Sequence, residues 1–242
     1  MPAPSVLVIS GTGTEIGKTV VTSAVAAAAL AAGRSVAVLK PAQTGVGPDE
    51  PGDAAEAVRL AGSAVTAVEL ARYPEPLAPD TAARRAGLAT LSPARIAEAA
   101  QRLARSHDLV LVEGAGGLLV RFDEAGNTLA DAARLLGAPT LIVAPAGLGT
   151  LNSTALTAEA LRARELDALG VVIGSWPADP GLAARCNLAD LPSVSALPLL
   201  GAIPSGAGSW DPAAFRAAAP SWLAAPLAGT WSAGSFLTSW PA

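Results

Sequence analysis

Short apolar runs alternate along this chain with longer stretches rich in alanine, leucine and arginine. The runs have the length and β-branched content of buried strands, whereas the stretches between them have helical length and spacing. This alternation is typical of βαβ units, and it predicts one α/β domain with a mainly parallel sheet flanked by helices. Strands are predicted at 5–10, 35–39, 109–112, 140–144, 169–173 and 199–203, and helices near 17–32, 53–61, 93–105, 128–136, 152–167, 180–190 and 212–224.

The remaining stretches divide into connecting loops and a tail. Residues 46–52 and 73–80 are predicted to be loops, and loops that follow strands are where α/β domains bind ligands. We assign residues 1–229 to the domain and 230–242 to a C-terminal extension. Four of the five tryptophans lie from Trp210 onward, where they would anchor surface packing or the edge of a dimer.

The first predicted strand runs into a glycine-rich segment, G-T-G-T-E-I-G-K-T at residues 11–19. Its glycines let the backbone turn N–H groups toward an anion, and the positive end of the next helix faces the same point. Lys18 would reach the β- and γ-phosphates of a nucleotide, and the Thr19 hydroxyl would bind magnesium. Five residues, not the common four, separate Gly11 from Gly17, but the flanking strand and helix favour nucleotide binding over a bare turn.

Three charged residues stand beside predicted strand ends or helix starts. Lys40 follows the second strand, which Pro41 is expected to stop, so its ammonium lies near the phosphates unless it is an ordinary surface lysine. Glu113 follows four apolar residues and suits magnesium binding, with a capping glutamate as the alternative. Asp53 opens the helix near 53–61 as either a metal ligand or an N-cap.

Composition narrows the class of protein. The chain has 242 residues, of which 51% are hydrophobic, and its net charge of -4 offers no basic surface for nucleic acid. The uncharged run 19–33 is dominated by alanine and follows the phosphate loop, so neither a membrane span nor a signal peptide is indicated and we expect a soluble, cytoplasmic protein. A single cysteine and a single histidine leave any metal to oxygen ligands.

Five further motifs follow the phosphate loop in order. They are K-P-A-Q-T-G at 40–45, Asp53, E-G-A-G-G at 113–117, G-T-L-N at 149–152 and P-L-L-G-A-I-P at 198–204. Together with the five-residue glycine spacing, this series resembles the dethiobiotin synthetase family. The resemblance implies a P-loop NTPase-like fold in a homodimeric, ATP-dependent enzyme of biotin synthesis.

The same resemblance implies a ring-closing ligation. A diamine, 7,8-diaminopelargonic acid (7,8-diaminononanoate), would react with carbon dioxide to give a carbamate, which attacks the γ-phosphate of the nucleoside triphosphate. The second amine would then attack the carbamic-phosphoric anhydride, expel phosphate and leave dethiobiotin. Positioning and electrostatic stabilisation would supply most of the catalysis.

The family motifs assign roles to residues of this chain. Lys18 and Lys40 would be catalytic, and Thr19, Asp53 and Glu113 would hold Mg²⁺. The residues that would bind the nucleotide are Thr14, Glu15, Ile16, Gly17, Lys18, Thr19, Val20, Asp53, Glu113, Gly114, Ala115, Gly116, Gly174, Ser175, Ile203, Pro204 and Ser205. The residues that would contact the diamine are Thr44 and, from the partner subunit across the dimer, Leu148, Gly149, Thr150, Leu151 and Asn152.

Two positions depart from the family pattern. Ser175 stands where an asparagine commonly reads the adenine edge, so base recognition would rest on backbone groups and accept other triphosphates besides ATP. Ser153 stands where a histidine is common. The segment 147–153 is predicted to open a helix with Asn152 or Ser153 as its N-cap, so that its free N–H groups receive the carboxylate of the diamine; the alternative is an ordinary capped helix start.

Two other classes of P-loop protein are weighed against the synthetase. A switch ATPase of the partitioning or site-placement type shares the fold and dimer, but its loop usually carries an additional lysine, which Thr12 and Gly13 do not supply. A cobalamin amidoligase has a related loop but normally adds a glutaminase domain with a catalytic cysteine. The lone Cys186 and the chain length leave no room for that domain.

Overall fold

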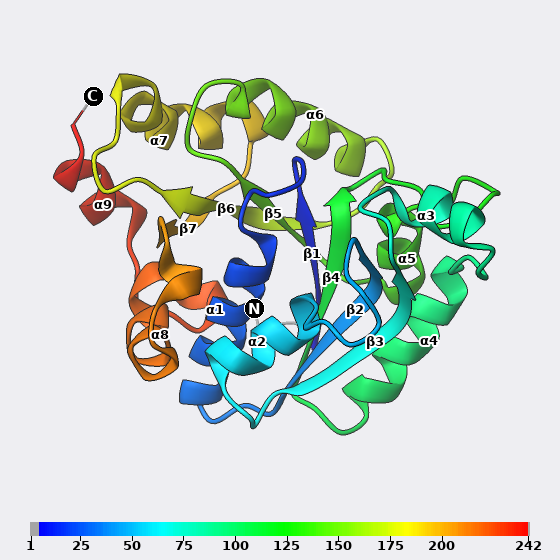
Figure 1. Ribbon diagram of the computed structural model, residues 1–242. Coiled ribbons are helices and arrows are strands. Elements are labelled where there is room, and N and C mark those ends of the chain that lie inside the picture. Colours follow the sequence, from blue (N-terminus) through cyan, green and yellow to red (C-terminus); the bar gives the residue numbers. More distant parts are fainter. Residues whose placement is uncertain (1–4, 242) are drawn as a thin grey trace.

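Seven strands, each parallel to its neighbours, form the centre of the computed structural model, which describes residues 5–241 (Figure 1). Their order across the sheet is β3-β2-β4-β1-β5-β6-β7. The strands are β1 (Val6–Gly11), β2 (Val36–Thr44), β3 (Thr66–Tyr73), β4 (Leu109–Gly117), β5 (Thr140–Ala144), β6 (Ala168–Trp176) and β7 (Leu199–Pro204). The predicted α/β class is therefore confirmed.

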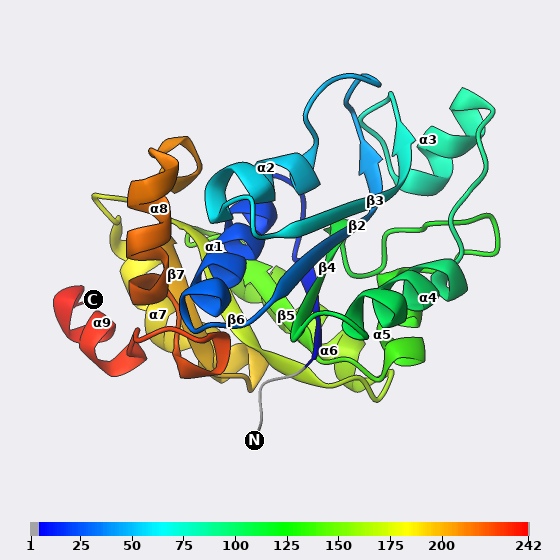
Figure 2. The same ribbon diagram turned by 90° about the horizontal axis from the view of Figure 1, so that it is seen from below.

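Helices cover both faces of this sheet. One layer contains α1, α2 and α8, and the other contains α4, α5, α6 and α7 (Figure 2). The helices are α1 (Lys18–Ala31), α2 (Asp53–Ala61), α3 (Pro79–Ala86), α4 (Pro93–Ala104), α5 (Leu129–Leu136), α6 (Thr150–Arg162), α7 (Leu182–Ser195), α8 (Pro212–Ala218) and α9 (Ala233–Ser239), and three short 3₁₀ turns span Ala207–Ser209, Ala219–Trp222 and Ala225–Leu227. Among the described residues, no helix combines the length and apolarity that crossing a membrane requires.

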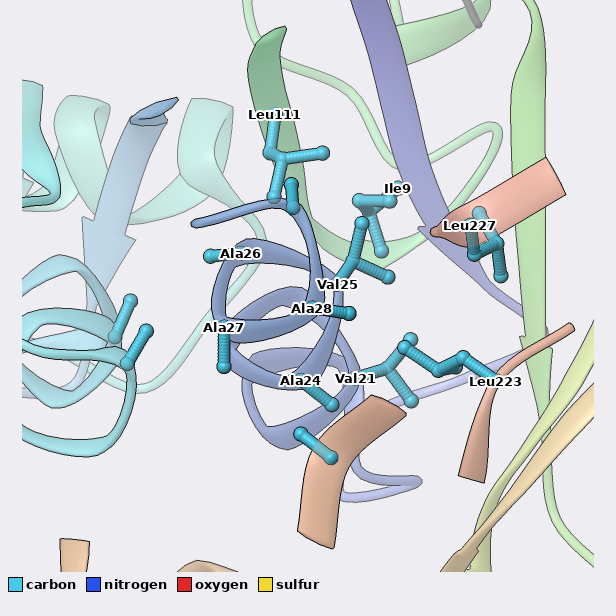
Figure 3. Close-up of a cluster of buried hydrophobic side chains, with 14 of the residues drawn as sticks. Ile9, Val21, Ala24, Val25, Ala26, Ala27, Ala28, Leu111, Leu223 and Leu227 are labelled. Carbon is cyan, nitrogen blue, oxygen red and sulfur yellow. The ribbon is translucent and has the colours of Figure 1, made fainter. Parts of the chain in front are cut away.

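Helix α1 is buried on nearly all sides, which explains its alanine-rich sequence. Its small side chains allow close packing between the sheet on one side and α2, α8 and the 3₁₀ turn 219–222 on the other. Figure 3 shows Val25 beside Ile9 of β1 and Val21 beside Leu223. A helix without a polar face is stable only in such surroundings, so the core itself holds α1 behind the phosphate loop.

The strand order sets the place of the site. Strands β2, β4 and β1 are successive neighbours, so their carboxyl ends lie side by side at one edge of the sheet. The chain reverses its direction of winding at β1, because β4 lies on one side of it and β5 on the other. Ligands of open α/β sheets bind in the crevice at such a switch point.

Two strand predictions are wrong. Pro41 does not stop β2, which continues to Thr44; pairing with β4 ends at Leu39, so a residue without an N–H is tolerated beyond it. Strand β3 was not predicted, because its burial is only partial and its polar residues Glu69 and Arg72 mask the apolar alternation. The predicted loop at 73–80 also extends into the start of α3, since Pro79 begins a helix.

Several helix boundaries differ from the prediction, and the helix predicted at 152–167 spans Thr150–Arg162. Helix α7 extends past Pro192 to Ser195, and the helix predicted near 212–224 is divided into α8 and a 3₁₀ turn. The tail predicted as an extension contains α9, which packs against α7 and β7. Residues 1–4 of the predicted domain and residue 242 of the predicted extension lie outside the described residues.

Phe215 on α8 offers a test of this core. Its ring is fully buried and lies edge-on to Trp222 at a centroid distance of 5.3 Å. We expect Phe215→Ala to lower the free energy of unfolding by about 3–5 kcal/mol, the usual cost of the resulting cavity. Urea unfolding measures the loss, and Leu135→Ala, on the exposed face of α5, serves as the control with a change within about 0.5 kcal/mol. Equal losses would contradict the packing.

Candidate active site

The phosphate loop connects β1 to α1 through two residues with left-handed backbone geometry, Glu15 at φ 57° and Gly17 at φ 89°. A Cβ on Gly17 would lie 2.4 Å from the carbonyl oxygen of Gly174 on β6, so only glycine fits. The Lys18 ammonium donates to the carbonyl of Gly13 at 2.7 Å. The loop is thus curled around its own lysine and pressed against β6.

A buried lysine lies beside this loop in the middle of β2. Lys40 is 3% exposed, and its ammonium donates to Glu113 Oε1 at 3.0 Å and to the carbonyl of Gly114 at 3.1 Å. It also forms an ion pair with Asp53 at the start of α2. Glu113, itself 1% exposed, accepts a further hydrogen bond from the Thr19 hydroxyl at 2.9 Å. Residues of β2 and β4 and of the starts of α1 and α2 therefore meet in one polar cluster.

The two lysines of this cluster differ in their electrostatics. Burial disfavours the charge on Lys40, but the carboxylates of Glu113 and Asp53 outweigh it and raise the pKa above the usual value. Its stabilising pairing is therefore lost only as the pH rises through that raised pKa. Burial, reinforced by repulsion from Lys40, lowers the pKa of Lys18. An anion placed between the two ammonium groups would relieve that repulsion.

A cleft of about 960 Å³ opens over the cluster. Lys18 and Lys40, the only lysines in the chain, both line it. The predicted site residues that line it are Thr14, Glu15, Gly17, Lys18, Thr19, Val20, Lys40, Thr44, Asp53, Glu113, Ala115 and Gly116. Ala42, Gln43, Val46, Val120 and the segment 76–79 also line it but were not predicted.

Other predicted residues lie outside that lining. Ile16 is half-buried against the core, and buried Gly114 contributes its carbonyl to Lys40. The predicted base-binding residues cluster at the ends of β6 and β7: Gly174, Ser175, Ile203, Pro204 and Ser205. A Cβ on Gly174 would lie 2.0 Å from the carbonyl oxygen of Ile16, which places this end of β6 directly behind the phosphate loop.

The segment predicted to contact the diamine lies away from the cleft of its own chain. Leu148 is 91% exposed, Asn152 is exposed, and Thr150 is fully buried with its hydroxyl 3.5 Å from Thr154. Gly149, at φ 89°, is the N-cap of α6, so the predicted N-cap at Asn152 or Ser153 is wrong. Leu151 packs partly against the core between α6 and α7.

Gln43 is a functional candidate that the sequence did not reveal. It is 5% exposed, and its Oε1 accepts from the backbone N–H of Asp53 at 2.8 Å. A Cβ on Gly52 would lie 2.7 Å from that oxygen, so a larger residue there would displace the Gln43 amide. Gly52, not Asp53, occupies the N-cap position, which excludes the simple capping alternative for Asp53. Gln43 thus positions Asp53 beside Lys40; a polar residue inside a buried strand was the available signal.

The oxygen atoms of the cluster suit a magnesium ion. Two carboxylates and one hydroxyl, from Asp53, Glu113 and Thr19, are the donor types that this hard cation prefers. Glu113 Oε2 is buried and has no hydrogen-bond partner, which leaves one acceptor unused at the cluster. These donors fit the predicted metal.

Curated relatives match the chain over nearly its whole length. The ATP-dependent dethiobiotin synthetase BioD of Streptomyces avermitilis is 71% identical over 97% of this chain and 98% of its own. The protein of the same name from Saccharopolyspora erythraea is 67% identical over 94% of this chain and 99% of its own. The chain belongs to the ATP-dependent dethiobiotin synthetase family. This confirms the predicted resemblance and the expectation of an ATP-dependent cyclo-ligase.

Broader comparisons agree with the fold of a dethiobiotin synthetase. Residues 5–212 match a family model described as an AAA domain. A ParA family ATPase from Chlorobium tepidum superposes with a TM-score of 0.57 at 13% identity, covering 93% of this chain and 96% of the other. A chain of the MinC:MinD cell division complex from Aquifex aeolicus gives 0.54 at 12% identity, covering 89% and 86%. At this identity the likeness shows the P-loop fold alone, so the switch ATPase is not favoured over the synthetase.

Gln43→Leu tests the positioning of Asp53 in this synthetase. The change keeps the size of the side chain but removes the acceptor of the Asp53 N–H, so we expect the free energy of unfolding to fall by about 1–2 kcal/mol. Urea unfolding measures the loss. Gln101→Leu, at an exposed position of α4, is the matched control and should change by less than about 0.5 kcal/mol. A Gln43 variant as stable as its control would argue against the role.

Proposed function

We propose that this chain closes the urea ring of dethiobiotin in the cytoplasm. The substrates would be 7,8-diaminopelargonic acid, carbon dioxide and ATP or another nucleoside triphosphate. The carbamate of one amine attacks the γ-phosphorus and releases the nucleoside diphosphate; the second amine then attacks the carbonyl carbon and expels phosphate. The observation that carries the proposal is the pair of lysines in one cleft, because this reaction must bring an anionic carbamate against an anionic triphosphate.

Each of the two lysines would offset the negative charge of a different part of the substrates. Lys18, curled into the phosphate loop, would exchange its bond with Gly13 for the β- and γ-phosphates. Lys40, in β2, would bridge the carbamate oxygen and the transferring phosphoryl group. Its raised pKa supports this role, since the ammonium stays charged at neutral pH.

Magnesium would be held by Thr19, Asp53 and Glu113, directly or through water. When bound, the ion supplies Lewis-acid stabilisation of negative charge on the phosphates. The residues of this chain do the remaining work: Gln43 orients Asp53, and the Thr19 hydroxyl fixes Glu113 through their hydrogen bond. The unpartnered Oε2 of Glu113 supports the assignment.

The remaining contacts to the substrates would come from both subunits of a homodimer. Thr44 lines the cleft near one end of the diamine, whereas Leu148 and Asn152 are exposed away from the cleft of their own chain. That separation supports contacts made in trans, with segment 148–152 reaching the partner's cleft. At the base end, exposed Ser175 and Ser205 support loose, mainly backbone recognition of the nucleobase.

Phosphate release tests the reaction directly. The chain given the diamine, bicarbonate, Mg²⁺ and ATP should release phosphate and form a product of dethiobiotin mass, and omitting any one component should abolish both. Chelation by EDTA should act like omission of Mg²⁺. Equal phosphate release without the diamine would instead support the switch ATPase.

Lys40→Met tests the bridging lysine. Removing the ammonium should lower kcat by about 10²- to 10³-fold, as the loss of a group that stabilises transition-state charge does. ATP binding, measured by calorimetry, should survive because Lys18 and the phosphate loop remain. Arg59→Met, which removes an exposed cation paired with Glu56, is the control and should leave kcat unchanged. Near-normal turnover in folded Lys40→Met would contradict the proposed role of Lys40 in the reaction.

A further inference from the structure

Three consecutive residues at the end of β6 face three different surroundings. Gly174 lies against the phosphate loop, where a side chain would collide with the carbonyl of Ile16. Ser175 is exposed on the side where the nucleobase is proposed to bind. Trp176 is 5% exposed and packs into the core beside α7. The position of Ser175 is therefore fixed by an anchor on either side of it.

The second of these anchors is made by the C-terminal tail. The ring of Trp176 lies edge-on to Phe236 of α9 at 5.3 Å between centroids, and it lies 5.9 Å from Trp240 just after α9. Trp231 adds a contact with Phe236 at 5.4 Å. Aromatic pairs at these distances contribute packing beyond burial alone.

Trp176 also connects β6 to the other half of the proposed base site. Trp176 is paired with Pro204 at the end of β7 in the sheet register. The Trp176 carbonyl accepts a hydrogen bond from the backbone N–H of Ser205 at 2.7 Å. Ser175 and Ser205 are thus held by one residue, Trp176. A displacement of its ring would move both.

The described part of the tail, residues 230–241, carries no charged side chain. Arg216 is the last charged side chain in the sequence. The backbone N–H groups of Thr230 and Trp231 donate to the carbonyls of Pro220 and Leu223 at 2.8 and 2.9 Å, and α9 follows directly. A Cβ on Gly229 would lie 1.9 Å from the Leu223 carbonyl, so the turn into the tail is tight. Apolar packing and a fixed backbone path hold α9 on Trp176.

We propose that α9 is a positioning element for the nucleobase end of the nucleotide, and that it acts through Trp176 on Ser175 and Ser205. The proposal rests on the proposed function, which places the base at these serines. Under this proposal the tail contributes to nucleotide affinity and base discrimination, while the loop after β1 binds the phosphates. None of its aromatic residues touches the reacting atoms, so they position and do not catalyse.

Two ligands separate the base end from the phosphate end. ATP engages both, whereas inorganic tripolyphosphate has no base or ribose. In Phe236→Ala and Trp240→Ala, we expect the Kd of ATP, measured by calorimetry with Mg²⁺, to rise by about 2- to 30-fold, the usual range for indirect coupling. The Kd of tripolyphosphate should stay within about twofold. Trp240→Leu, which keeps apolar bulk, should recover most of the lost ATP affinity.

Trp210→Ala is the matched control. Trp210 packs edge-on to Trp222 at 5.3 Å in a separate aromatic group, so its removal should leave the Kd of both ligands unchanged. Tryptophan emission reports whether the contact of α9 with Trp176 has loosened in each variant. Thermal unfolding establishes which variants fold, and because Phe236 and Trp240 are both half-buried, either alanine variant alone carries the test.

Three results would overturn the proposal. The first is an unchanged Kd of ATP in folded variants whose emission shows that α9 has loosened. The second is an equal weakening of tripolyphosphate, which would mean that the phosphate loop moved instead. The third is an equal effect of Trp210→Ala. Failure of the unmodified chain to bind ATP would contradict the proposed function itself and is seen before any variant is made.

Discussion

The ammonium of Lys40 joins segments that are far apart in the chain, and the shape of the cleft depends on it. Lys40 and Glu113 are buried in the neighbouring strands β2 and β4, where an unpaired carboxylate would be strongly destabilising. The ion pair with Lys40 therefore allows Glu113 to be buried as a carboxylate. A second ion pair, between Lys40 and Asp53, holds the start of α2 beside the same ammonium. Through Glu113, the Thr19 hydroxyl connects the cluster to the phosphate loop.

Much of this arrangement could be predicted because its residues lie in short contiguous segments. Lys18 and Thr19 follow a strand and a run of glycines, and Glu113 follows four apolar residues, so each lies within the local element that places it. A parallel sheet then aligns the carboxyl ends of β1, β2 and β4 without further information. The identity of the reaction came from the family motifs, because the spacing of residues alone indicated only a nucleotide site.

Features that depend on contacts across the fold could not be predicted. Strand β3 lies outermost in the sheet and is only partly buried, so its sequence lacks a clear apolar pattern. Pro41 predicts a strand end because the sequence does not show that β4 stops pairing before it. Gln43 gains its role from the loop that returns to it, and Trp176 gains its neighbours from a helix near the end of the chain.

The chain uses arginine for its cationic side chains everywhere except in the cleft, where both of its lysines lie. A guanidinium stays protonated under ordinary conditions, whereas a lysine amine reacts with acylating reagents once it loses its proton. An amine-directed label can therefore modify only the α-amino group and the two cleft lysines. The pKa of Lys18 is lowered, whereas Lys40 is buried in ion pairs that raise its pKa, so Lys18 is the more reactive of the two. Protection of Lys18 from such a label would measure occupancy of the cleft by its ligands, with no background from surface lysines.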